Sequence, residues 1–135
     1  MKKDEREFLL DTHIWLWYLL GSDRLPEACR SVIDASTSAC WFSPVSVWEI
    51  GMLAKKRRID LLDGDRAWVT RALDIFPLKE ASLTREVALR SNEVELPHDD
   101  PADHFLAATA LVFDLTLITV DQRLIGHEWL PTLSA

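Results

Sequence analysis

The stretch Phe8-Leu9-Leu10-Asp11-Thr12-His13 decides how this chain is expected to fold. The apolar run before Asp11 is too short for a free-standing helix and indicates a buried strand. Asp11 ends that run with a charge that a hydrophobic core would reject unless something binds it. A strongly apolar segment, 14–20, follows at once and predicts a helix that ends at Gly21. We therefore expect a strand that leads directly into a helix, with an acid at the junction.

The rest of the chain repeats this order of a short strand followed by a helix. Further strands are expected at 39–42, 75–78 and 115–120, and further helices at 26–35, 44–56, 66–73, 81–92 and 101–114. Since no hairpin signal separates the strands, this alternation predicts an α/β fold, a three-layer α/β/α sandwich around a short parallel sheet. In such folds the ligand site lies beyond the carboxyl ends of the strands.

Length and composition indicate a single soluble domain. The chain has 135 residues, and we assign 1–135 to one domain in which 1–7 form a polar extension without an assigned role. No segment has the length of a membrane span or the pattern of a secretory signal. Cys29 and Cys40 form no metal-binding pair, and we expect reduced thiols in a cytoplasm.

The net charge of −7 argues against generic electrostatic binding to nucleic acid. It does not exclude an enzyme that acts on nucleic acid, because acids that hold cations present positive charge to a phosphate. The charge balance therefore directs attention to the acids themselves.

Three further acids lie in positions comparable to that of Asp11. Asp121 also ends an apolar run, Glu49 lies beside the apolar stripe of its helix, and Asp103 lies in the first turn of its helix. An ordinary role is available to each: a helix cap for Asp11 and a capping box for Asp103. Glu49 would then be a solvated helix residue and Asp121 a turn residue. Because all four map to the carboxyl edge of the predicted sheet, we expect their side chains to meet.

Clustered carboxylates raise one another's pKa values unless cations lie among them. Oxygen ligands without a His or Cys cluster indicate Mg²⁺ or Mn²⁺ rather than zinc. The four histidines, at positions 13, 98, 104 and 127, have no zinc spacing, and we interpret them as ordinary polar residues.

Four blocks of the sequence resemble PIN-domain ribonucleases, and most of all the VapC toxins of bacterial type II toxin–antitoxin systems. The blocks are Leu9-Leu10-Asp11-Thr12-His13, Ser43-Pro44-Val45-Ser46-Val47-Trp48-Glu49-Ile50, Asp100-Pro101-Ala102-Asp103 with Leu106-Ala107-Ala108-Thr109-Ala110, and Ile118-Thr119-Val120-Asp121. They come in the family's order and together span nearly the whole chain.

The resemblance implies a PIN-like nuclease domain and a cytoplasmic, magnesium-dependent endoribonuclease that hydrolyses RNA and is held inactive by a VapB-like antitoxin. It also implies that operator DNA is bound only through the antitoxin. The family's acidic quartet matches four catalytic candidates in this chain: Asp11, Glu49, Asp103 and Asp121. Of these, Asp11, Asp103 and Asp121 would hold Mg²⁺ or Mn²⁺. Ser46 and Thr119 match polar positions beside them.

Three positions depart from the family pattern. The family usually has an aromatic residue at 102 and an arginine at 104, where this chain has Ala102 and His104. Position 99, often basic, is Asp99. These differences concern the surface that grips RNA more than the metal site.

Two surfaces are candidates for macromolecular contacts. The basic cluster at the end of helix 44–56 consists of Lys55, Lys56, Arg57 and Arg58. It is either a solvated helix end or a site for RNA phosphates. The helix 12–20 is apolar on more than one face through Trp15, Trp17 and Tyr18. We expect it both to pack in the core and to form a homodimer or antitoxin interface.

Two alternative functions stay open on the sequence alone. One is a PIN-like module that binds RNA or a partner without cutting, although pure binding has no need of a costly carboxylate cluster. The other is a different Mg²⁺-dependent phosphoryl-transfer enzyme. A haloacid-dehalogenase-like phosphatase would need a second Asp two residues after Asp11, and a receiver domain would need a Lys after its last strand.

Overall fold

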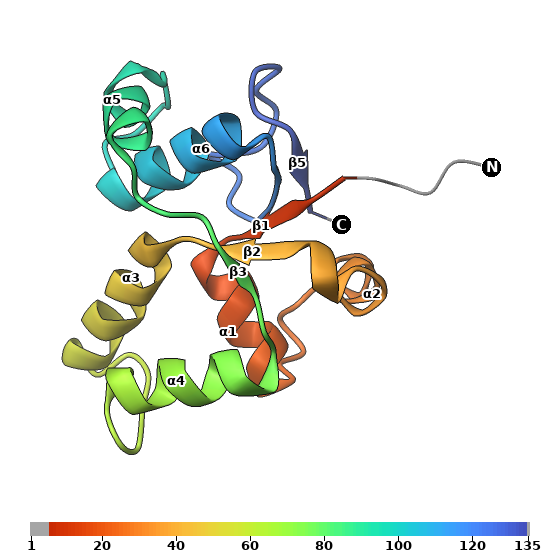
Figure 1. Cartoon of the computed structure of the whole chain (residues 1–135), viewed down its shortest axis with the longest axis vertical. Coiled ribbons are helices and arrows are strands. Elements are labelled where there is room, and N and C mark those ends of the chain that lie inside the picture. The colour runs from red at the N-terminus through yellow and green to blue at the C-terminus, as the bar shows by residue number, and fades with distance from the viewer. Residues whose placement is uncertain (1–5, 135) are drawn as a thin grey trace.

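The computed structural model describes residues 6–134 (Figure 1). Within them the strands are β1 (Phe8–Leu10), β2 (Cys40–Phe42), β3 (Lys79–Glu80), β4 (Thr116–Ile118) and β5 (Thr132–Leu133). The α-helices are α1 (Thr12–Leu20), α2 (Glu27–Ala35), α3 (Pro44–Lys55), α4 (Asp65–Ile75), α5 (Arg85–Glu93) and α6 (Pro101–Phe113). A short 3₁₀ helix, Thr37–Ala39, precedes β2.

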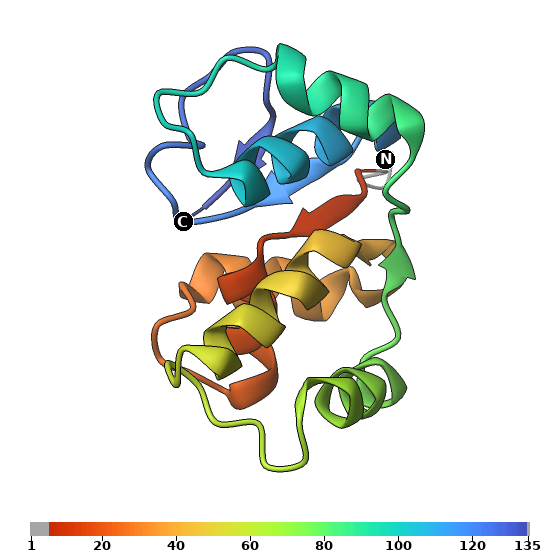
Figure 2. The same ribbon diagram turned by 90° about the vertical axis from the view of Figure 1, so that its left-hand side faces the viewer.

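The strands form one parallel sheet in the order β3-β2-β1-β4-β5. Helices α5 and α6 cover one face of this sheet, and α1, α2, α3 and α4 lie on the other (Figure 2). The predicted α/β/α sandwich around a short parallel sheet is therefore confirmed.

β1 is apolar throughout because it is buried on both faces, as expected for the middle strand of a parallel sheet. Phe8 and Leu10 belong to the core cluster that includes Trp15 of α1 and Ile50 of α3. Leu9 points the other way, into a second cluster with Leu106 and other α6 residues. The central strand thus separates two hydrophobic cores.

Three helices begin directly at the carboxyl edge of the sheet, each with a side-chain cap. Asp11 accepts a hydrogen bond from Thr12 N at 2.7 Å, Ser43 from Val45 N at 3.1 Å, and Asp100 from Ala102 N at 3.1 Å. In the last two helices a proline follows the cap at the first helical position, where its missing N–H costs nothing. These short entries hold the first turns of α1, α3 and α6 near one another.

The prediction of a strand at 75–78 is wrong. Residue 75 ends α4, and the third strand is Lys79–Glu80, which pairs with Trp41 and Phe42 of β2. The helix expected at 81–92 begins only at Arg85, capped by Thr84. The short edge strand β5 was not expected, since only two residues form it.

The first helix confirms the packing part of its prediction. Trp15 is fully buried, while Trp17 and Tyr18 are partly buried against the same core. Cys29 and Cys40 are buried free thiols. Among the described residues, no helix has both the length and the apolar character that a membrane span requires.

The polar extension has a structural contact at its end. Residues 1–5 lie outside the described residues, but the Glu7 carboxylate accepts hydrogen bonds from Trp41 Nε1 at 3.0 Å and Lys79 Nζ at 3.1 Å. Glu7 therefore joins the start of β1 to β2 and β3.

Candidate active site

The strand order places a topological switch between β1 and β4. The chain leaves β1 toward β2 on one side, whereas β4 and β5 lie on the other. Asp11 directly follows β1, and its backbone N–H donates to Ile118 O at 3.0 Å, at the end of β4. In open α/β sheets, ligands bind in the crevice beyond the carboxyl ends of the strands at such a point.

Thr12 links Asp11 to Glu49. The Thr12 hydroxyl oxygen lies 2.5 Å from Glu49 Oε1 and 2.8 Å from Ser46 Oγ. Because a hydroxyl has one proton, Thr12 can donate to the carboxylate while accepting from Ser46. Ser46 is fully buried one turn before Glu49 on α3, so it holds Thr12 in place. The polar role predicted for Ser46 therefore reaches Glu49 through Thr12, a residue that the sequence analysis did not single out.

Thr119 links Asp11 to Asp121. Its buried hydroxyl donates to Asp11 Oδ2 at 2.6 Å and accepts from the Asp121 backbone N–H at 3.1 Å. Thr119 therefore fixes both the Asp11 carboxylate and the turn that carries Asp121.

Arg123 links Asp121 to Asp103. Its guanidinium donates to Asp121 Oδ1 from Nε at 3.1 Å and to Oδ2 from Nη2 at 2.8 Å. The same Nη2 lies 3.5 Å from Asp103 Oδ2. The four predicted acids thus belong to one continuous series of polar contacts that runs through Thr12, Thr119 and Arg123.

His98 is not the ordinary polar residue that the sequence suggested. Its Nε2 lies 2.6 Å from Asp103 Oδ2, and its Nδ1 is buried without a hydrogen-bond partner. Ligand atoms of His98, Asp100 and Asp103 all lie within 4.8 Å of one another. The spacing of the histidines gave no signal for this contact. A histidine five residues before a candidate acid, in the loop that leads to its helix, could have given one.

Burial and mutual repulsion perturb three of the acids. Burial raises the pKa of Asp11 to about 6. The hydrogen bond from Thr119 lowers this pKa in part, and repulsion from Asp103 raises it further. Burial likewise raises the pKa of Glu49 to about 7, with added repulsion from Asp11, Asp100 and Asp103. The pKa of Asp103 is also raised by burial, despite its hydrogen bond with His98. Only the pKa of Asp121 is lowered, chiefly by its hydrogen bonds with Arg123.

This donor set fits a divalent cation. Asp11 is 9% exposed and Asp103 is 6% exposed, so their charges are poorly hydrated. A bound cation would relieve the repulsion that raises their pKa values. Carboxylate oxygens suit Mg²⁺ and Mn²⁺, and the nearby His98 imidazole is also compatible with Mn²⁺.

The other predicted positions lie around this group. The basic cluster Lys55–Arg58 is exposed at the end of α3, two turns beyond Glu49. The ring nitrogens of His104 lie 2.9 Å from His98 O and 3.3 Å from Ser91 O. His104 therefore fastens the loop that carries His98. Ala102 is buried and Asp99 is exposed.

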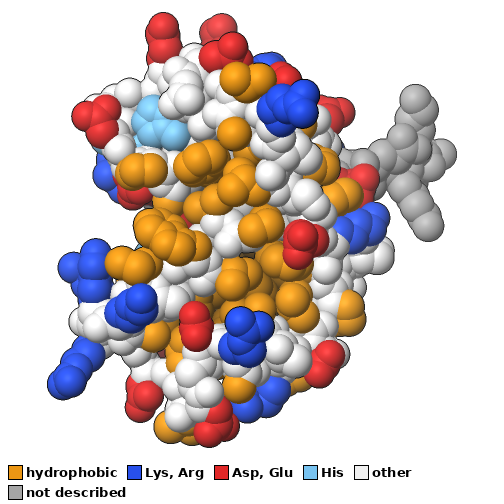
Figure 3. All heavy atoms as spheres, turned by 60° about the vertical axis from the view of Figure 1, so that its left-hand side comes forward, with side chains coloured by type: hydrophobic (Ala, Val, Ile, Leu, Met, Phe, Trp, Pro, Cys, Tyr) orange, Lys and Arg blue, Asp and Glu red, His pale blue; other side chains and the backbone are white. Residues whose placement is uncertain are grey.

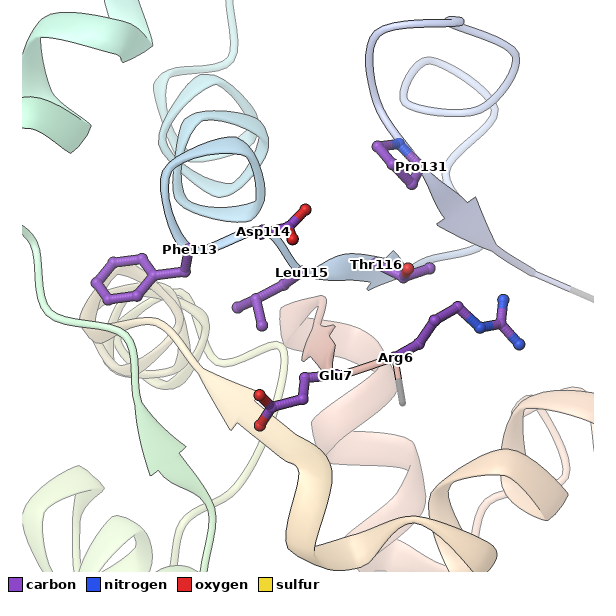
Figure 4. A pocket seen from close by; sticks show the side chains of 7 residues that line it. All are labelled: Arg6, Glu7, Phe113, Asp114, Leu115, Thr116 and Pro131. Carbon is purple, nitrogen blue, oxygen red and sulfur yellow. The ribbon is translucent and has the colours of Figure 1, made fainter. Parts of the chain in front are cut away.

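A separate pocket with a volume of about 420 Å³ opens at the opposite edge of the sheet (Figure 4). Residues from the starts of β1 and β4 and from the end of α6 line it: Arg6, Glu7, Phe113, Asp114, Leu115, Thr116 and Pro131. None of the four candidate acids is among them. The acids and this pocket are therefore distinct sites.

Comparison with known proteins agrees with this geometry. A sequence model of the PIN domain matches residues 8–128. The ribonuclease VapC22 of Mycobacterium tuberculosis is 30% identical over 123 residues, which cover 89% of this chain and 91% of that protein. The chain therefore belongs to the PIN-domain family, which removes the other phosphoryl-transfer folds from consideration.

Solved structures support the fold. A DNA-bound VapBC from Salmonella typhimurium matches with a TM-score of 0.71 at 17% identity, covering 96% of this chain and 98% of that one. VapBC2 from Rickettsia felis, bound to a DNA fragment from its promoter, matches with a TM-score of 0.67 at 14% identity, covering 94% and 97%. At these identities the likeness concerns the fold alone.

Proposed function

We propose that this protein is a cytoplasmic, metal-dependent endoribonuclease toxin of the VapC type. The observation that supports the proposal is the series of polar contacts that links Asp11, Glu49, Asp103 and Asp121 beyond the carboxyl ends of β1 and β4. The name of the Mycobacterium tuberculosis relative, a ribonuclease, supports the reaction class. A module that only binds RNA would gain nothing from buried acids with raised pKa values.

The residues would divide the work as follows. Asp11, Asp103 and Asp121 would hold Mg²⁺ or Mn²⁺, and the ion would supply Lewis-acid chemistry for the hydrolysis of the phosphodiester. Thr119 and Thr12 keep two of the carboxylates oriented. Glu49, with a pKa of about 7, is suited to accept a proton from the attacking water near neutral pH. The family reaction implies products with a 5′-phosphate and a 3′-hydroxyl.

The test is cleavage of total bacterial RNA by the purified protein with Mg²⁺, with EDTA and after Asp103→Asn. We expect cuts only in the first reaction and a loss of at least about 100-fold in the variant. Calorimetric titration with Mn²⁺ accompanies the assay. A wild-type protein that binds RNA but never cuts it, with or without metal, would establish the binding-module alternative.

We also propose a VapB-like antitoxin as the partner that inhibits this activity. The support is that solved structures of similar fold include VapBC complexes, two of them with DNA. Operator DNA would then be bound only through the antitoxin. The test is co-expression with a small protein encoded next to the gene for this chain, followed by purification and the RNA assay. A co-purifying complex that cuts as fast as the free protein would contradict the proposal.

A second copy of the chain is the proposed occupant of an apolar groove between α3 and α6. Figure 3 shows hydrophobic side chains gathered on this side of the molecule. The groove has a volume of about 520 Å³. Its lining is almost wholly apolar and consists of Pro44, Val45, Trp48, Leu83, Pro101, Ala102 and Phe105. No residue that lines the groove is charged, so two copies of the chain could meet there without burying an unpaired charge.

Trp48→Asp is expected to turn a dimer into a monomer, because Trp48 is 58% exposed in that groove and a charge there would be buried unpaired. Sedimentation velocity measures the outcome. Leu62→Asp is the matched control, since Leu62 is 87% exposed on a loop away from the groove. A wild-type monomer, or a Trp48→Asp dimer, would contradict the assignment.

The basic cluster should contribute to RNA affinity. The double variant Lys56→Glu and Arg58→Glu is expected to weaken RNA binding about tenfold or more and to flatten its dependence on salt, because phosphate contacts release counterions. Fluorescence anisotropy at several salt concentrations measures both effects. Arg24→Glu with Arg90→Glu gives the same change in net charge elsewhere. Equal losses in the two double variants would mean that only net charge matters and that the cluster is a solvated helix end.

A further inference from the structure

Arg123 takes up the carboxylate oxygens that a cation would need. Three donors of this residue reach Asp121, namely its backbone N–H at 2.9 Å, Nε and Nη2. Nη2 also forms an ion pair with Asp103 Oδ2 at 3.5 Å. Two of the three proposed metal ligands are therefore engaged by one guanidinium, and a cation among these acids would have to compete with it.

The guanidinium can leave without disturbing the acids. Asp121 keeps the backbone N–H of Arg123 on Oδ1, and its own N–H stays on Thr119 Oγ1. The turn itself is anchored, since Leu124 N donates to Asp121 O at 3.0 Å and the Leu124 side chain is fully buried. By contrast, the Arg123 side chain is 50% exposed. Rotation of this side chain alone would take the guanidinium away from both carboxylates, while Asp103 Oδ2 keeps its contact with His98 Nε2 at 2.6 Å.

We propose, on the basis of the function proposed above, that Arg123 alternates between two anionic partners. In the metal-free protein it neutralises Asp103 and Asp121, and once a divalent cation is bound it swings outward and contacts a phosphate of the RNA beside the cut bond. A planar guanidinium suits both roles, because its fork of donors matches carboxylate and phosphate alike.

The two roles predict opposite effects of one substitution. Arg123→Gln removes the competitor, so Mn²⁺ affinity in calorimetry without RNA should increase about tenfold, the value of one charged hydrogen bond. RNA affinity should fall about tenfold, and its salt slope should fall by about one phosphate contact. RNA binding is measured by anisotropy with Mn²⁺ in a Glu49→Gln background, which stops turnover and keeps the three proposed metal ligands.

Two further variants test whether Arg123 opposes metal binding by occupying the carboxylate oxygens or only through its positive charge. Arg123→Lys keeps the charge but loses the fork, so it should bind Mn²⁺ more tightly than the wild type while retaining part of the RNA affinity. Arg71→Gln removes an equally exposed arginine that pairs with the remote Asp63. This control should leave both affinities unchanged.

Several results would overturn the inference. Unchanged or weaker Mn²⁺ binding by Arg123→Gln would mean that Arg123 supports the ligands instead of competing with metal. Unchanged RNA binding would remove the phosphate contact. If Arg123→Lys binds Mn²⁺ with the same affinity as the wild type, the effect of Arg123 on metal binding would come from its charge and not from its contacts with the carboxylates. A wild-type protein that binds no Mn²⁺ and cuts no RNA would instead contradict the proposed nuclease, so the two failures are distinguishable.

Discussion

Asp11→Asn is expected to unfold at a higher temperature than the wild type and to cut no RNA. The pKa of Asp11 is about 6 instead of its ordinary 3.8, so at about 1.4 kcal/mol per pKa unit its ionisation costs the metal-free fold about 3 kcal/mol at pH 7. Asparagine removes this charge and is an equally good helix cap. Its amide does lose the charge-assisted bond from Thr119, so we expect a net gain of about 1–3 kcal/mol.

Thermal unfolding in EDTA at pH 7 measures the gain, which corresponds to about 3–10 °C. Asp60→Asn is the matched control, because Asp60 is an exposed carboxylate and its neutralisation should leave the midpoint unchanged. RNA cleavage by Asp11→Asn should fall to the background rate, since a proposed metal ligand is lost. An Asp11→Asn protein that is clearly less stable than the wild type would mean that the buried charge is well compensated by its hydrogen bonds.

Acidification of the metal-free protein should stabilise it between about pH 7.5 and pH 5. The raised pKa values of Asp11, about 6, and Glu49, about 7, mean that the folded state binds protons in this range that the unfolded state does not. Stability therefore falls as pH rises, and Asp11 alone contributes at least about 1 kcal/mol over the interval. Asp121, with its lowered pKa, acts in the opposite direction but only below this range.

Saturating Mg²⁺ should reverse that dependence. The proposed ligands must be ionised to bind the cation, so its stabilising effect should be largest at pH 7.5 and should shrink as pH falls. Urea unfolding at pH 5, 6 and 7.5, with EDTA or with Mg²⁺, measures both trends. In the double variant Asp11→Asn and Glu49→Gln, the slope in EDTA should be much flatter. If wild-type stability in EDTA instead falls on acidification, the raised pKa values cannot govern the pH response.

The fold was predictable wherever an element carries its own signal. The apolar run of β1, the Gly21 helix end and the Ser43–Pro44 helix start are local, and all appear in the structure. β3 was misplaced because its two residues, Lys79 and Glu80, are exposed and charged. Only their pairing with β2 makes them a strand, and no local pattern encodes that pairing. Of the apolar residues at 75–76, Ile75 ends α4 and is exposed, whereas Phe76 belongs to the core.

The site was predictable to the extent that topology places residues. Acids that follow parallel strands, or lie on helices begun at the strand ends, must gather at one edge. The side chains that join them could not be inferred in this way. His98, Thr12 and Arg123 are near the acids in sequence, but their partners depend on side-chain geometry across separate segments. The sequence therefore indicated which acids belong to one series of polar contacts and left open the residues that make those contacts.

The central strand has a consequence for how the protein loses activity. Glu49 lies on α3, whose Ile50 packs in one core, whereas Asp103 and Asp121 lie close in sequence to Leu106 and Leu124 of the other. The candidate site therefore takes its acids from both sides of the sheet, and each side packs in its own hydrophobic core. A modest loosening of either half would misalign the acids well before the chain unfolds. RNA cleavage would therefore depend on the alignment of the two halves, and we expect heating to abolish cleavage at a temperature below the unfolding midpoint.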